Sequence, residues 1–146
     1  MQSTRPISIN NSLSHGICNY SCVTCGVNSE GYNGPVQFQD IATIKKLIER
    51  IEEADAEGVT VRYLANAGAG EPTVHPRFCA VMSLYGDLLR KRAAAHLPSM
   101  EISVVTNGAK LTEDGIVDAV AENGLTLIVS LPTLDPEQYG TIMVRD

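Results

Sequence analysis

Three cysteines, Cys18, Cys22 and Cys25, lie close together in the chain with the spacing C-x3-C-x2-C. Thiolates this close repel one another, and a bound metal centre relieves that repulsion. Cysteine clusters hold zinc or iron–sulfur centres, and both kinds usually take four protein ligands. The local sequence supplies three, so the fourth ligand decides what kind of centre this is.

Two other residues could complete a conventional site with four protein ligands. His15 precedes Cys18 by three residues and would make a Cys3His zinc site, whereas Cys79 would complete a ferredoxin-like electron carrier. Cys79 is interpreted instead as a small buried residue on a helix. The spacing favours an iron–sulfur centre over zinc but leaves both open.

Three further segments carry residues suited to a ligand site. The segment Gly68-Ala69-Gly70-Glu71-Pro72 follows an apolar run, Thr106-Asn107-Gly108 follows a second, and Ser130 lies near the end of a third. Glycine lets a backbone approach a ligand closely. Each segment alone also fits a plain turn or a strand-end hydroxyl bonded to backbone. Their significance depends on whether the fold brings them together.

The apolar periodicity alternates between strand-like and helix-like segments. Four strands are predicted, at about residues 7–13, 59–64, 101–106 and 125–131. A helix capped by Asp40 and ending near Gly58 separates the first two strands. The second predicted helix has Pro76 in its first turn, the third is capped by Thr112, and a fourth begins at Asp135-Pro136-Glu137.

This βαβαβαβ order predicts a parallel sheet with right-handed crossovers. All strand-to-helix loops then emerge at the carboxyl edge of the strands, where ligands bind in α/β proteins. The cysteine loop, the two glycine-containing loops and Ser130 are therefore predicted to converge. The last strand is apolar enough to be buried on both faces, yet it would be an exposed edge here. We therefore expect a truncated protein, or one that needs a partner.

Composition narrows the functional classes. The chain has 146 residues, 44% of them hydrophobic and 19% charged, as expected of one globular domain. Its 17 acidic and 11 basic residues give a net charge of −6, which provides no evident surface for nucleic acid. We find no apolar run of membrane-spanning length and no signal peptide at residues 1–6. Bunched cysteines are unlike a disulfide framework, so a cytoplasmic location is predicted.

The cysteine spacing after the first strand, together with Gly70-Glu71-Pro72 after the second, resembles the radical S-adenosylmethionine (radical SAM) enzymes. The resemblance spans the whole chain. It implies an α/β fold, a partial TIM-like (β/α)6 barrel with about the first four βα units present. Residues 1–146 would be the N-terminal part of the core domain. It also implies that Cys18, Cys22 and Cys25 hold a [4Fe–4S] cluster, whose remaining iron is chelated by the amino and carboxylate groups of SAM.

The resemblance also implies residues that contact SAM. They come from the cysteine loop, the two later loops and the fourth strand: Thr24, Gly70, Glu71, Pro72, Thr106, Asn107 and Ser130. Two positions depart from the family pattern. Ala69 replaces a glycine, and Thr24 stands where most members have an aromatic residue near the adenine. Stacking on the adenine would therefore be lost or come from elsewhere, for example from Tyr20.

The implied reaction is reductive cleavage of SAM to methionine and a 5′-deoxyadenosyl radical, which removes a hydrogen atom from an unidentified substrate. Modification of a peptide or a natural product is one interpretation, and RNA or a small molecule fits the same residues. An external one-electron reductant of the flavodoxin or ferredoxin type is implied. The alternative is a non-catalytic metal module, either an electron-transfer iron–sulfur protein or a structural zinc protein.

Overall fold

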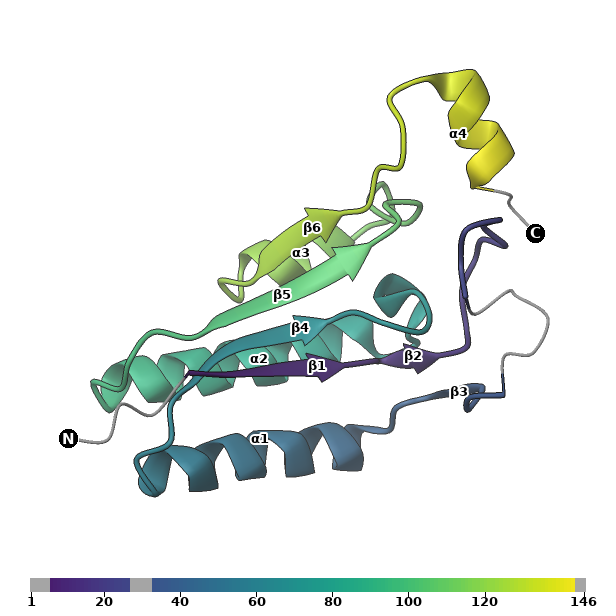
Figure 1. The fold of residues 1–146 in the computed structure, drawn as a ribbon. Coiled ribbons are helices and arrows are strands. Elements are labelled where there is room, and N and C mark those ends of the chain that lie inside the picture. The colour runs from purple at the N-terminus through teal and green to yellow at the C-terminus, as the bar shows by residue number, and fades with distance from the viewer. Residues whose placement is uncertain (1–5, 27–32, 144–146) are drawn as a thin grey trace.

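The computed structural model describes residues 6–26 and 33–143, which form an α/β fold. Four parallel strands make one sheet in the order β1-β4-β5-β6. Their bounds are Ile7–Asn11 for β1, Val61–Asn66 for β4, Glu101–Thr106 for β5 and Thr126–Val129 for β6. The strands point the same way in Figure 1, toward the segment that holds the cysteines. The predicted parallel α/β architecture is confirmed.

Helices α1, α2 and α3 lie along one face of this sheet (Figure 1). They span Ile41–Ala56, Phe78–Ala94 and Ile116–Ala121, and a short 3-10 helix, η1, spans Pro72–Val74. Helix α1 begins where predicted, because the Asp40 carboxylate accepts a hydrogen bond of 2.6 Å from the Thr43 amide. Past its end Gly58 has a φ of 76°, which glycine adopts readily.

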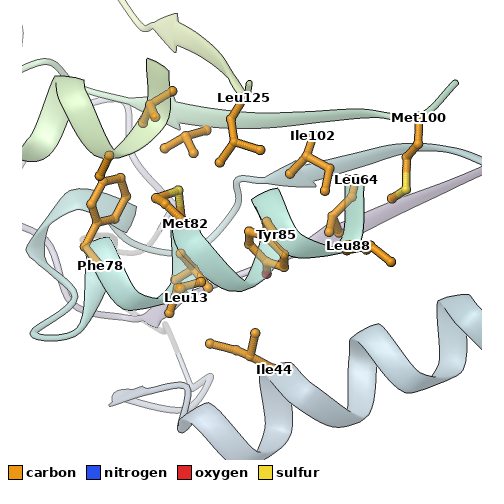
Figure 2. Packing of buried hydrophobic residues seen from close by; sticks show 14 of the residues in the cluster. Leu13, Ile44, Leu64, Phe78, Met82, Tyr85, Leu88, Met100, Ile102 and Leu125 are labelled. Atoms are coloured by element: carbon orange, nitrogen blue, oxygen red, sulfur yellow. The ribbon is translucent and has the colours of Figure 1, made fainter. Parts of the chain in front are cut away.

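The hydrophobic core lies between the sheet and these helices. Leu64 and Ile102 project from the strands toward Met82 and Leu88 of α2, as Figure 2 shows. Ile44 of α1 joins the same cluster and is fully buried. Burial of apolar surface supplies most of the free energy of folding. This packing holds the helices against one face of the sheet. It therefore also holds the ends of the strands in place.

A buried polar network lies beside this core, at the ends of β1 and β4. The Tyr85 hydroxyl donates to Asn66 Oδ1 at 3.0 Å, and Asn11 Nδ2 lies 3.2 Å from the same oxygen. Asn66 in turn donates to the Ser103 carbonyl at 3.2 Å. Burial raises the pKa of Tyr85 well above its ordinary value, so its hydroxyl stays protonated and can donate. The network holds together the strand ends from which the site loops leave.

Two short strands and a fourth helix complete the described chain. β2 (Ser14–His15) pairs antiparallel with β3 (Gln37–Phe38), which fixes the start of the cysteine loop against the segment that leads into α1. Helix α4 spans Pro136–Ile142, begins where predicted and is capped by Asp135. In Figure 1 it stands apart from the sheet, near the cysteine segment. None of the helices in the described part of the chain is long and apolar enough to span a bilayer.

Several predicted boundaries were wrong. The first strand ends at Asn11, and η1 and the turn after it intervene before α2, so Pro76 precedes that helix. Thr112 does not cap α3, which begins at Ile116. Residues 108–115 form successive turns, and Gly115 has a φ of 80° that no α-helix can contain. The third helix is therefore much shorter than its apolar pattern indicates.

The predicted exposed edge is confirmed within the described residues. β6 is the last strand of the sheet and pairs with β5 on one side. Ile128 and Val129 remain 44% and 45% exposed, respectively. Parallel strands of this apolar composition are normally covered on both faces. The sequence of β6 therefore suits a more buried environment than the one this chain alone provides.

Candidate functional site

A cavity of about 380 Å³ lies at the carboxyl edge of the parallel strands. It is enclosed by the cysteine loop, the loop after β4, the end of β5 and the segment after β6. Nine of the ten residues predicted for the cluster and SAM line it: Cys18, Cys22, Thr24, Cys25, Gly70, Glu71, Thr106, Asn107 and Ser130. Pro72 does not line it, because it is buried as the first residue of η1. The structure thus brings the predicted residues together, while their ligand roles remain predictions.

Backbone hydrogen bonds tie the cysteine loop to the loop after β4. The Gly16 amide donates to the Ala69 carbonyl at 2.9 Å, and the Glu71 amide donates back to the Ile17 carbonyl at 2.9 Å. The Ser12 hydroxyl adds a bond of 3.1 Å to the same Ala69 carbonyl. The two loops therefore form one unit, and the cysteines are placed by the loop that follows β4.

Gly70 packs tightly against the backbone that leads into the cysteine loop. Its φ is 123°, a conformation that side-chain-bearing residues rarely adopt. A Cβ atom at this position would lie 1.6 Å from the Ser14 carbonyl oxygen and 2.7 Å from the Ile17 carbonyl oxygen. Only glycine fits there. The close approach that this glycine permits is first of all to the backbone of the cysteine loop.

The Glu71 carboxylate is committed to hydrogen bonds within the protein. Glu71 is 3% exposed, and its Oε1 accepts bonds from the Thr73 amide at 3.0 Å and from the Thr73 and Thr106 hydroxyls at 2.6 Å each. Its Oε2 accepts a bond of 2.7 Å from the Asn107 amide. A buried carboxylate is tolerated when its oxygens are satisfied in this way. Glu71 therefore joins the loop after β4 to the end of β5.

We expect Glu71→Gln to lower the free energy of unfolding by about 1.5–3 kcal/mol, the usual contribution of hydrogen bonds to a charged group. With the amide oxygen at the Oε1 position, its NH2 group would oppose the Asn107 N–H, so that bond is lost. Urea denaturation of the cluster-free protein measures the change. Glu53→Gln is the matched control, because Glu53 is exposed and its one ion pair among the described residues is with Arg50 at 3.1 Å. Equal stability of the two variants would contradict this role for Glu71.

The three cysteines are free thiols and all are partly buried. Burial raises the pKa of Cys18, and the nearby Glu71 charge adds to this, while N–H groups of Tyr20, Asn107 and Asn19 oppose it. Burial also raises the pKa of Cys22, and the nearby Cys18 and Cys25 raise it further. The thiols are therefore close enough to disfavour one another's ionisation. A cationic centre would remove that penalty.

The donor set fits an iron–sulfur cluster. Three thiols on one loop face a common cavity, and in a cluster thiolates bind different irons rather than one ion. Among the described residues, no three His, Cys, Asp or Glu side chains are grouped as one metal ion requires. His15 is absent from the cavity lining. Cys79 is exposed on α2, with its Sγ 3.7 Å from the Gly115 carbonyl oxygen, so its predicted burial was wrong.

Helix α4 supplies contacts that sequence reasoning missed. Met143, which follows α4, lines the cavity, and its Sδ lies 3.2 Å from Cys22 Sγ. The Val23 amide donates to the Ile142 carbonyl at 3.2 Å. Tyr139 interacts with Tyr20, and its pKa is raised by burial and by this neighbour. No local sequence pattern predicts these contacts, because they join segments that are more than a hundred residues apart.

The chain is similar to known proteins in both sequence and fold. The model of the radical SAM superfamily matches residues 13–146. The fold is similar to the crystal structure of BtrN in complex with AdoMet and 2-DOIA, with a TM-score of 0.65 and 21% identity over 86% of this chain and 46% of that one. The crystal structure of BtrN in an open conformation is similar with a TM-score of 0.62 and 20% sequence identity, over 92% of this chain and 54% of that one. The structure of TYW1 with a lysine–pyruvate adduct bound is similar with a TM-score of 0.53 and 18% sequence identity, over 94% of this chain and 46% of that one.

A curated protein is also similar in sequence, but the match covers a smaller share of that protein than of the solved structures. The protein named GTPase Obg of Brachyspira hyodysenteriae (strain ATCC 49526 / WA1) is 24% identical over 135 residues, which are 92% of this chain and 18% of that protein. The present sequence contains no G-x4-G-K-[ST] phosphate-binding loop. The chain thus spans about half of the solved structures and less than a fifth of this relative.

Proposed function

This chain belongs to the radical SAM superfamily, and on that basis we propose that residues 1–146 are the N-terminal part of an enzyme core that cleaves SAM reductively. One observation carries the proposal. The residues predicted for the cluster and for SAM come from four separate segments, and nine of the ten line one cavity. A metal module without a second substrate would not require the loops after β4 and β5 to face the cysteines.

In this proposal the thiolates of Cys18, Cys22 and Cys25 would hold a [4Fe–4S] cluster, and SAM would take the place of a fourth protein ligand. A cluster bound there would supply the one-electron reduction that cleaves SAM to methionine and a 5′-deoxyadenosyl radical, which would take a hydrogen atom from the substrate. The protein's part is to orient SAM and exclude water.

The loop after β4 is proposed to bind the SAM amino group. The Ala69 carbonyl already accepts bonds from Gly16 and Ser12, so it is committed to the protein. The carbonyls of Gly68 and Gly70 flank it, and both residues line the cavity. We assign these two carbonyls to the ammonium group. Pro72 would act indirectly by starting η1 and ending this loop.

The methionine and ribose portions of SAM would lie nearer to β5 and β6. Thr106 and Ser130 line that side of the cavity, and the Ser130 amide donates to the Thr106 carbonyl at 2.7 Å. Thr24 lies on the cysteine loop, where its backbone is proposed to contact the adenine. The chain would draw its electron from a flavodoxin- or ferredoxin-type donor in a reducing cytoplasm. None of these contacts selects a substrate, so the peptide or natural-product interpretation remains a prediction.

Metal content tests this proposal against a zinc module. Anoxically purified protein is expected to be brown, with about four irons and four sulfides per chain. It should also show an absorption band in the visible region that bleaches on reduction. A colourless protein that holds one zinc per chain would contradict the proposal. A brown protein that leaves SAM intact would instead be an electron carrier.

A further inference from the structure

The side chain of Asn107 is held in place by hydrogen bonds at both of its polar atoms. Its Nδ2 donates to Cys18 Sγ at 3.6 Å and to Asn19 Oδ1 at 2.8 Å. Its Oδ1 accepts a bond of 2.9 Å from the Ala109 amide. An amide has two donor hydrogens, and both are used here. A bond donated by this NH2 group to SAM would therefore have to replace one of these two bonds, whereas Oδ1 keeps one lone pair.

The backbone of Asn107 is fixed as well, since its amide donates to the buried Glu71 carboxylate at 2.7 Å. Glu71 is held in turn by Thr73 and Thr106. A continuous chain of hydrogen bonds thus runs from Glu71 through Asn107 to the Cys18 sulfur. Residues locked in this way orient their partner without reorganising.

Cys18 is surrounded by N–H donors. The backbone N–H groups of Asn19 and Tyr20 lower the pKa of its thiol, and the Asn107 side-chain amide donates to its sulfur from the end of β5. Hydrogen bonds to cluster sulfurs are among the features that set the reduction potential of an iron–sulfur centre. They stabilise the more negative, reduced form, because N–H···S bonds strengthen with charge on the sulfur.

We propose that Asn107 is a positioning residue for the cluster, whose amide N–H donates to the Cys18 thiolate and raises the reduction potential. This inference rests on the proposed function of the site. It gives the Asn107 N–H group a role in the cluster's environment, distinct from the direct SAM contact implied by the family resemblance. Its effect should therefore be measurable before any SAM is added.

The test uses the intact protein, reconstituted with iron and sulfide without oxygen and titrated potentiometrically in the absence of SAM. Electron paramagnetic resonance reports the reduced cluster. Asn107→Asp and Asn107→Leu both remove the donor at similar volume, and in both the backbone bond to Glu71 remains. At a fixed applied potential we expect the ratio of reduced to oxidised cluster to fall in both variants, by up to about tenfold, which is 59 mV for a one-electron couple.

Two controls separate the hydrogen bond from other effects. Asn123→Leu makes the same neutral change on the segment after α3, away from the cavity, so the potential should stay within error of wild type. Asn123→Asp introduces the same charge on the segment after α3, away from the cavity, and should also leave it unchanged. Iron release to a chelator gives a second readout, and both Asn107 variants should lose iron faster than either control.

The outcomes distinguish this inference from the function on which it rests. Asn107 variants with wild-type potential and wild-type iron release would overturn the inference while leaving the function intact. A shift in Asn107→Asp alone would assign the effect to charge and would also overturn it. A wild-type protein that holds no cluster overturns both. If both Asn107 variants show the expected shift but the wild-type protein never cleaves SAM, only the proposed function is overturned.

Discussion

Cys22→Ala is expected to abolish both the cluster and SAM cleavage. Cys22 is the middle ligand of the predicted set, and removing it leaves two thiols for a cluster that already lacks a fourth protein ligand. Iron and sulfide content should fall to background after anoxic reconstitution, and formation of 5′-deoxyadenosine should fall below detection. Folding should persist, because Cys22 is only partly buried and lies outside the hydrophobic core.

Cys79→Ala is the matched control for this variant. It removes a thiol by the same chemical change, but Cys79 is exposed on α2 and does not line the cavity. Iron content and SAM cleavage should equal those of wild type. Retained iron and activity in Cys22→Ala would refute the assignment of Cys22 as a ligand. Lost iron in Cys79→Ala would show that the cluster lies elsewhere.

Gly70→Ala is expected to disrupt the site through the backbone. The added Cβ would overlap the Ser14 carbonyl oxygen, at 1.6 Å, and no side-chain rotation relieves a clash with backbone. The positive φ of 123° adds strain for any residue with a side chain. The loops must separate, so we expect unfolding free energy to fall by at least about 3 kcal/mol. Urea denaturation and iron content after reconstitution should both show the loss.

Gly26→Ala is the corresponding control within the cysteine loop. Apart from its chain neighbours, no atom of the described residues lies within 4 Å of a Cβ built at Gly26, which is adjacent to Cys25. Stability should change by no more than about 0.5 kcal/mol, and iron content should be retained. A Gly70→Ala protein as stable as wild type and with a full cluster would show that the two loops do not pack as described.

The sequence predicted the architecture well, because its signals are local. Asp40 caps α1 as expected, and α4 begins after Asp135 as expected. The alternation of strands and helices determines which loops share one edge of the sheet. The predicted burial of Cys79 was wrong for a reason visible in the helix period. The buried residues Phe78, Val81 and Met82 define the core-facing side of α2, and Cys79 lies off that side.

The contacts that refine the site are not local and could not be predicted. Asn107 and Cys18 are 89 positions apart, and Met143 and Cys22 are 121 apart. The sequence indicated that Asn107 belonged to the site but not which of its neighbours it would contact. Similarly, the requirement for glycine at Gly70 arises from the Ser14 carbonyl, which approaches it from β2. Such tertiary contacts decide roles that a motif can only suggest.

Product analysis of SAM cleavage tests the central claim most directly. The intact protein is reconstituted anoxically, reduced with dithionite and incubated with SAM, and 5′-deoxyadenosine and methionine are quantified by chromatography. We predict that both products form in equal amounts, that neither forms without dithionite, and that Cys22→Ala forms neither. A fully reconstituted, reducible iron–sulfur protein that leaves SAM uncleaved would contradict the claim.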